Sequence, residues 1–161
     1  MKYKTDGGGF ATSCDDIKIF GNGSTWATKL SQLAKSTGNL IIMTYGFRVR
    51  TGKYATETLE DEHSYIREIL DKRPTNIFIL CNSNSIADAK IIKRLYPQIR
   101  IRHHKSINAN IALLEPQTVI FSSEEFGFSD KAGYGVGFHS NEIYEEMIKQ
   151  FRLSWEKSEE I

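Results

Sequence analysis

The feature that most constrains the fold of this chain is an alternation of short apolar runs with segments of helical periodicity. "NLIIMTYGF" (39–47) and "NIFILCN" (76–82) are almost continuously apolar, which is typical of strands buried on both faces of a sheet. Segments 58–72 and 85–96 follow these runs and repeat apolar residues at helical spacing. Strands that alternate with helices in this way predict an α/β fold.

The rest of the chain completes the same pattern. A closing helix over 141–158 would direct an apolar stripe toward the core, formed by Ile143, Met147, Ile148, Phe151 and Trp155. We further predict a helix over 24–36 and strands over 15–21, 98–104, 107–115, 118–126 and within the glycine-rich segment 127–138.

Length and composition are those of one ordinary globular domain. The 161 residues are 40% apolar and 25% charged, and we treat 1–161 as a single domain with a flexible N-terminal segment over 1–14. No run approaches the roughly 18 apolar residues of a membrane span, and no secretory signal is present, which predicts a cytoplasmic location. A net charge of +1 gives no overall electrostatic argument for nucleic acid. Cys14 and Cys81 match no metal or redox spacing, and Cys81 lies in an apolar run that predicts a buried thiol.

The stretch "INANIALLEPQTVIFSSEEFG" (107–127) resembles the central hairpin of one half of the phospholipase D superfamily. Asn108-Ala109-Asn110 falls where that family has His-x-Lys, and Ser122-Ser123 falls at its Gly-Ser or Ser-Ser pair. Glu115 lies near the family's acidic position, Glu125 takes the place of its Asn, and Gly135 stands where a glutamate is frequent. The similarity runs from about Asn39 to the C-terminus. It implies a mixed β-sheet flanked by helices, a homodimer that joins two half-sites, and chemistry that uses no metal and no cofactor.

The residues that carry the family reaction are changed. In the family a histidine attacks phosphorus, a second histidine protonates the leaving oxygen, and lysine, Asn and Ser side chains hold the phosphate charge. The amide nitrogen of Asn108 has no basic lone pair, and Asn110 carries no cation. Glu125 adds a negative charge where the family has a neutral donor. The resemblance therefore predicts the family framework without its phosphodiesterase activity.

A literal His-x-Lys occurs nearby in "RHHK" and leaves an active enzyme as the alternative. An active phosphodiesterase or nuclease would use His103 or His104 with Lys105 and Ser123. This alignment requires an insertion of five residues before the serine pair. Strand alternation places His103 on the same face as Ile99 and Ile101, which favours a histidine at the rim of the core.

Two groups of basic residues raise the question of nucleic acid. Arg48, Arg50 and Lys53 follow the first buried strand, and Arg102 and Lys105 belong to a second cluster that also contains Arg100 and His104. If both groups flank the pocket, they form a positive groove for a phosphate backbone. We therefore predict a degenerate member that binds DNA, RNA or a protein partner through the former active-site face. A deliberate replacement at positions 108 and 110 is a third explanation, although it leaves Glu125 and Gly135 unexplained.

Overall fold

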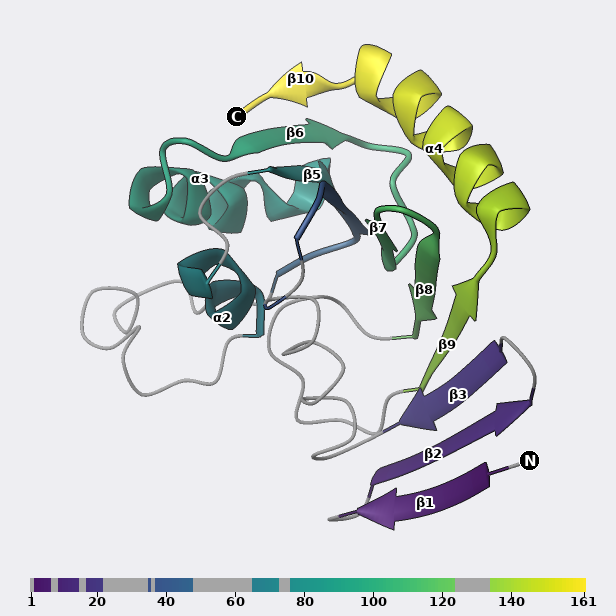
Figure 1. Cartoon of the computed structure of the whole chain (residues 1–161). Coiled ribbons are helices and arrows are strands. Elements are labelled where there is room, and N and C mark those ends of the chain that lie inside the picture. Colours follow the sequence, from purple (N-terminus) through teal and green to yellow (C-terminus); the bar gives the residue numbers. More distant parts are fainter. Residues whose placement is uncertain are drawn as a thin grey trace.

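One mixed sheet organises the part of the chain that the computed structural model describes, which comprises residues 2–6, 9–14, 17–21, 35, 37–47, 65–72, 76–123 and 134–161 (Figure 1). The sheet has ten strands in the order β1-β2-β3-β9-β8-β7-β4-β5-β6-β10. The strands are β1 (Lys2–Asp6), β2 (Gly9–Cys14), β3 (Ile17–Gly21), β4 (Leu40–Thr44), β5 (Ile77–Asn82), β6 (Arg100–His104), β7 (Ile111–Leu114), β8 (Thr118–Ser122), β9 (Tyr134–His139) and β10 (Glu159–Glu160). The helices are α2 (Tyr65–Lys72), a 3₁₀ turn η1 (Ser83–Ser85), α3 (Ile86–Leu95) and α4 (Asn141–Glu156).

Strands β4, β5 and β6 form the parallel part of the sheet, and every other pairing is antiparallel. Helix α2 precedes β5 and α3 connects β5 to β6, as parallel neighbours require a crossover. The carboxyl ends of β4, β5 and β6 consequently meet at one edge of the sheet. The start of β7 and the end of β8 lie at this same edge, because β7 runs antiparallel to both β4 and β8.

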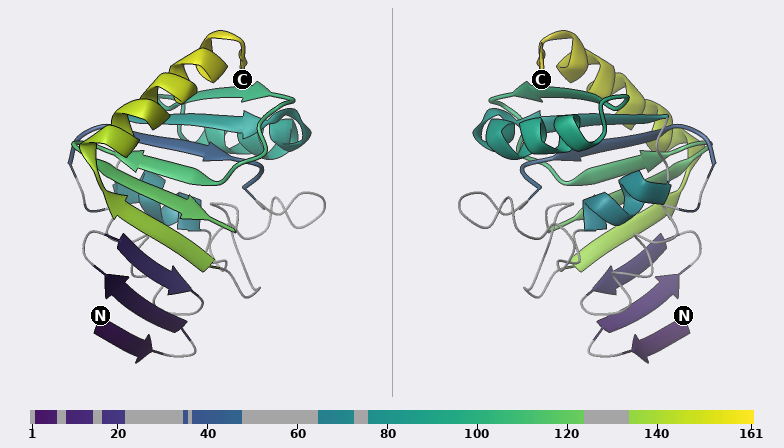
Figure 2. Two further views of the ribbon diagram at one scale, coloured as in Figure 1. Left: turned by 90° about the vertical axis from the view of Figure 1, so that its right-hand side faces the viewer. Right: turned by 90° about the vertical axis from the view of Figure 1, so that its left-hand side faces the viewer.

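Each central strand contributes side chains to two hydrophobic layers. On β4, Leu40 and Ile42 belong to the layer beneath α2 and α3, whereas Ile41 and Met43 belong to the layer beneath α4. Figure 2 shows α4 on one face of the sheet and α2 and α3 on the other. Full burial of one such aliphatic side chain stabilises a fold by about 1.5–3 kcal/mol. The helices complete the two layers with Ile69, Leu70, Ala89 and Ile92 on one face and with Tyr144 and Phe151 on the other.

The structure confirms the predicted central elements. The strands expected over 15–21, 39–47, 76–82 and 98–104 correspond to β3, β4, β5 and β6. The apolar stripe of α4 packs against the core as predicted, and Cys81 is buried, which raises the pKa of its thiol to about 12. The predicted segment 58–72 is helical from Tyr65 onward, and its earlier residues lie outside the described part of the chain. The helix predicted over 24–36 lies outside the described residues apart from Lys35, which is helical.

The margins of the sheet contain strands that the sequence analysis did not predict, and one predicted strand starts later than expected. Strands β1 and β2 lie within residues 1–14 and extend the sheet from β3 by antiparallel pairing. Backbone pairing to an open sheet edge orders polar segments that carry little apolar periodicity. Strand β7 begins at Ile111, not at residue 107, because the chain first crosses the ends of β5 and β4. Strand β10, which was not predicted, pairs with the outer edge of β6 through Glu159 and Glu160.

No helix in the described part of the chain is long and apolar enough to cross a membrane.

Candidate functional site

Polar residues gather at the edge of the sheet where the parallel strands end, and we call this region the site edge. The pairing of Met43 with Ile111 places Asn110 beside the end of β4, and the pairing of Ile111 with Phe121 places Ser122 beside Asn110. The carboxyl ends of parallel strands are a common location for ligand sites in α/β proteins. The site edge consists of Thr44, Tyr45, Asn82, Ser83, Asn84, Ser85, Lys105, Asn108, Asn110, Ser122 and Ser123.

Asn110, which the sequence resemblance aligns with the family lysine, is held by the end of β4. Its Oδ1 accepts a hydrogen bond from the backbone N–H of Tyr45 at 3.2 Å and lies 2.9 Å from the hydroxyl of Thr44. The backbone carbonyl of Asn110 accepts from the N–H of Ser122 at 2.8 Å, which joins the site edge to β8. These contacts fix the amide with its oxygen toward β4, so that Nδ2 is the group left to donate to a ligand.

Asn82 holds the segment that leads from β6 to β7. Its side chain is only 5% exposed, and its Nδ2 donates to the carbonyls of Lys105 at 3.1 Å and Ile107 at 2.7 Å. Its Oδ1 accepts from the backbone N–H of Asn84 at 2.8 Å and begins the 3₁₀ turn. The segment 105–110 therefore runs across the end of β5, and Asn108 in this segment is exposed.

Ser123 lies on the β9 side of Asn110. Its hydroxyl oxygen accepts a hydrogen bond from the N–H of Tyr134 at 2.8 Å, and its own N–H donates to the carbonyl of Tyr134 at the same distance. A hydroxyl that accepts in this way still has its proton to donate, so Ser123 can present one donor to a ligand. Glu125, which the resemblance aligns with the asparagine of the family motif, lies outside the described residues.

The two histidines lie elsewhere along this edge. Strands β7, β4 and β5 separate β6 from β8, a distance of roughly 19 Å at about 4.8 Å per strand step. His103 Nδ1 lies 3.0 Å from the Ser83 hydroxyl, and its Nε2 lies 3.9 Å from a carboxylate oxygen of Glu159. His104 Nδ1 accepts from the backbone N–H of Ser106 at 3.2 Å. Within one chain, the structure therefore does not bring either histidine to Ser123.

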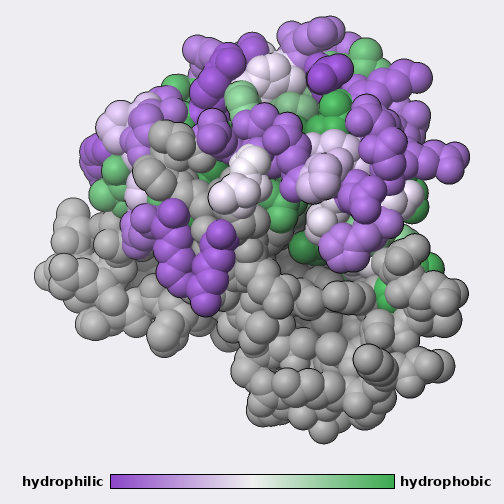
Figure 3. Space-filling view, in the orientation of Figure 1, coloured by the Kyte–Doolittle hydropathy of each residue, from purple (hydrophilic) through white to green (hydrophobic). Residues whose placement is uncertain are grey.

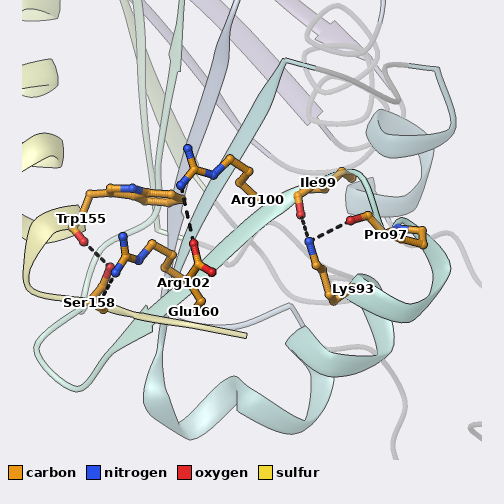
Figure 4. A network of polar contacts seen from close by, with 8 residues as sticks. All are labelled: Lys93, Pro97, Ile99, Arg100, Arg102, Trp155, Ser158 and Glu160. Carbon is orange, nitrogen blue, oxygen red and sulfur yellow. Dashed lines mark hydrogen bonds and ion pairs between the residues drawn. The ribbon is translucent and has the colours of Figure 1, made fainter.

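Arg102 faces α4 and takes part in a structural cluster, which Figure 4 shows. Its guanidinium lies 5.3 Å from the centre of the Trp155 ring and donates to the carbonyl of Ser158. Arg100 also lies over Trp155, at 5.5 Å, and pairs with Glu160 at 3.6 Å. These contacts connect β6 to the end of α4 and to β10. Of the predicted nucleic-acid residues, Lys105 is exposed at the site edge, and Arg48, Arg50 and Lys53 lie outside the described residues.

Sequence reasoning missed the polar turn after β5. "NSNS" (82–85) begins at the last residue of a buried strand, and this position alone could have identified it as part of a ligand edge. It also missed the position of Glu115, which lies at the opposite end of β7 and binds Asn39. Among the described residues, no group of three or more His, Cys, Asp or Glu side chains is arranged to hold a metal ion.

Comparison with known proteins gives structural likeness only. No protein-family model matches the sequence, and no curated protein does. Nuc from Salmonella typhimurium, a phospholipase D family member, superposes with a TM-score of 0.67 at 12% identity, over 90% of this chain and 97% of Nuc. NucT from Helicobacter pylori gives a TM-score of 0.62 at 13% identity, over 90% of this chain and 99% of NucT.

A third similar structure is that of TrmBL2, an archaeal chromatin protein described as having a novel mode of DNA binding. It gives a TM-score of 0.59 at 14% identity and covers 92% of this chain, which spans only 54% of TrmBL2. The superpositions on Nuc and NucT, by contrast, each cover most of this chain and nearly all of the other protein. On this evidence, together with its mixed sheet flanked by helices, the chain has a phospholipase D-like fold.

Proposed function

We propose that this protein binds nucleic acid through the site edge and does not perform the phosphodiesterase reaction of the phospholipase D superfamily. The observation that carries the proposal is the state of Asn110. A neutral amide occupies the lysine position, and β4 holds its oxygen, so that only an N–H donor faces a ligand. Such a donor can bind a phosphate oxygen or a base edge, but it cannot neutralise the charge of a reacting phosphate.

The arrangement of the remaining groups also argues against hydrolysis. The family reaction needs a nucleophilic histidine beside the phosphate-binding residues. Asn108 takes that position and has no basic nitrogen. His103 and His104 lie on β6, four strand steps from β8 and Ser123. The alternative enzyme with His103 or His104, Lys105 and Ser123 would thus require two copies whose site edges face each other across a two-fold axis.

The donors on the site edge suit nucleic acid better than a protein partner. Asn108, Ser123 and Lys105 are exposed there, and backbone and base atoms of nucleic acids are rich in acceptors. Figure 3 views the molecule from the side opposite the site edge and shows a mostly hydrophilic surface over the described residues, with hydrophobic residues in small groups. A protein-binding face usually presents a larger apolar patch, so that side does not favour a protein partner. The likeness to a chromatin protein described as binding DNA agrees with this reading.

Further parts of the proposal concern assembly and location. By analogy with single half-site members of the superfamily, we propose a homodimer with adjacent site edges. The basic residues Arg48, Arg50 and Lys53 would then extend the binding surface beyond Lys105, and the protein would act in the cytoplasm. Light scattering coupled to gel filtration tests the dimer by measuring the molar mass in solution. A measured mass of 18.4 kDa, that of a single chain, would exclude the dimer.

Asn110→Asp tests the binding site. An aspartate oxygen can still accept from Tyr45 and Thr44, so the fold should persist while the new charge repels phosphate. We expect affinity for a fluorescent oligonucleotide to fall roughly tenfold at low salt. The matched control is Asn141→Asp, which adds the same charge at the start of α4 on the opposite edge and should have little effect. Equal affinity of Asn110→Asp and the parent protein would overturn the proposed binding face.

Hydrolysis is tested separately with single- and double-stranded DNA and bis(p-nitrophenyl) phosphate in the presence of EDTA. We expect no turnover from the parent protein. Turnover that disappears in a His103→Ala/His104→Ala double variant would support the enzyme alternative and overturn the inactive reading. Oligonucleotide affinity that does not fall with rising salt concentration would argue against phosphate contacts at the site edge, since such contacts release counterions.

A further inference from the structure

Tyr45 is an exposed aromatic residue whose polar groups are all engaged. Its backbone N–H donates to Asn110 Oδ1 at 3.2 Å, and its carbonyl accepts from the Ser85 hydroxyl at 2.8 Å. Its phenolic oxygen accepts from Asn84 Nδ2 at 3.1 Å. The residue is nevertheless 36% exposed. The chain therefore holds this ring in one orientation without burying it.

An aromatic ring held in this way is suited to stacking. Freezing a mobile side chain on binding costs conformational entropy, and a ring fixed beforehand avoids most of that cost. The neighbours that fix Tyr45 belong to the site edge themselves, so a base that contacts the ring would also lie within reach of side-chain amides. Amides of Asn can both donate to and accept from the edges of bases.

A second exposed aromatic residue lies on the same edge. Tyr134 begins β9 and is 53% exposed, and its N–H donates to the Ser123 hydroxyl. Strands β8 and β7 separate β9 from β4, so the two tyrosines are roughly 14 Å apart at about 4.8 Å per strand step. Asn110, directly before β7, and Ser123, directly after β8, lie at the ends of the two strands between them. Two aromatic residues with polar donors between them form a track along which a flexible strand can lie.

We propose that Tyr45 is a stacking platform for an unpaired nucleobase, so that the site edge binds single-stranded nucleic acid in preference to duplex. The inference rests on the proposed nucleic-acid function and defines its ligand further. In a duplex the faces of the bases are covered by their neighbours, whereas an unpaired base can place its face against an aromatic ring. The neutral amides of the site edge fit this mode, because stacking adds affinity beyond that of Lys105, the one lysine or arginine among the described residues that define the site edge.

The test compares binding of one labelled sequence as a single strand and as a duplex. The parent protein should bind the single strand at least tenfold more tightly, and Tyr45→Ala should weaken that binding by roughly 5- to 100-fold. Tyr45→Phe keeps the ring and should stay within about threefold of the parent. Leu95→Ala, which trims an exposed residue of α3, is the control and should leave affinity unchanged.

An oligonucleotide series with one abasic position separates stacking from damage to the fold. The parent protein should lose affinity when the abasic position reaches the platform, and Tyr45→Ala should show no such dependence. Equal affinity for single strand and duplex, or an abasic effect that persists in Tyr45→Ala, would overturn the platform while the Asn110→Asp result still stands. Absence of binding to any nucleic acid would overturn the proposed function and the platform together.

Discussion

The two ends of β7 perform the same task with different chemistry. At the site edge, Asn110 uses a neutral amide oxygen to hold the end of β4 through Thr44 and Tyr45. At the opposite end, the carboxylate of Glu115 holds the start of β4, accepting from the N–H and the Nδ2 of Asn39, each at 2.9 Å. We call these the site clamp and the distal clamp.

The difference between the clamps is one of charge. The distal clamp uses a carboxylate, and the hydrogen bond from the backbone of Asn39, followed by that from its side chain, lowers the pKa of Glu115. The site clamp has no charge, so its geometry does not depend on pH through its own groups. A neutral clamp also contributes no carboxylate of its own beside the surface where an anionic ligand would bind. The site clamp can thus hold the end of β4 without electrostatic repulsion of nucleic acid at the site edge.

The largest effect is expected from Asn82→Ala, which breaks the support of the site clamp. The substitution leaves the carbonyls of Lys105 and Ile107 without their donor, so the segment that carries Asn108 loses its position. We expect the free energy of unfolding to fall by about 2–4 kcal/mol in urea titrations. Asn84→Ala, which removes an exposed side-chain bond, should cost less than about 1 kcal/mol. Equal losses in the two variants would show that the crossing segment does not depend on Asn82.

Gly38→Ala should weaken the distal clamp by a smaller amount. Gly38 has a φ of +91°, and a Cβ there would approach both the Cβ and the Oε2 of Glu115 to 3.2 Å. Backbone strain and the close contact together should cost about 1–3 kcal/mol in thermal or urea unfolding. Nucleic-acid affinity should stay unchanged because the substitution lies at the far edge. A loss of affinity that matches the loss of stability would show that the two clamps are coupled.

The sequence predicted the framework better than the clamps. Apolar runs such as 39–47 and 76–82 indicate strands by their own composition, and the structure has β4 and β5 there. The clamps depend on pairs far apart in the chain, such as Asn110 with Thr44, and no local pattern encodes which amide meets which strand end. The resemblance placed Glu115 near the family's acidic position, but only the sheet register shows that this position lies at the edge opposite Ser123.

The sequence also did not predict which basic side chains are held by contacts within the fold and which are exposed. Arg102 and Lys105 are both cations in one short basic stretch, and composition does not distinguish them. In the fold Arg102 is held against Trp155 and the carbonyl of Ser158, whereas Lys105 is exposed. The alternation of side chains along β6 explains why Arg102 points toward α4. Its contact with Trp155 on α4, however, depends on how the helix packs against the sheet. Residues that bind a ligand are thus recognised only once the residues used for structure are known.

The smallest expected effect is the change with pH in the stability that the distal clamp contributes, which distinguishes it from the site clamp. Because the pKa of Glu115 is lower in the fold than its ordinary value of 4.5, its contribution to stability is present above that value. This contribution is lost as pH falls through the lowered pKa of the folded state. Glu115 is exposed, so the contribution should be less than about 1 kcal/mol. Glu115→Gln lacks it, and the gap in unfolding free energy between parent and variant should close as the pH falls from above the ordinary value of 4.5 through the lowered pKa of the folded state.

Urea titrations at several pH values measure this gap directly. Glu156→Gln, which removes an exposed carboxylate from α4, controls for the loss of one negative charge. A variant that breaks the site clamp, such as Asn110→Leu, should show a deficit in stability that does not vary over the same pH range, because neither Asn110 nor Thr44 titrates. If the deficit of Asn110→Leu instead followed pH as that of Glu115→Gln does, the neutrality of the site clamp would not be what separates the two ends of β7. A constant deficit beside a closing gap would establish that charge alone distinguishes them.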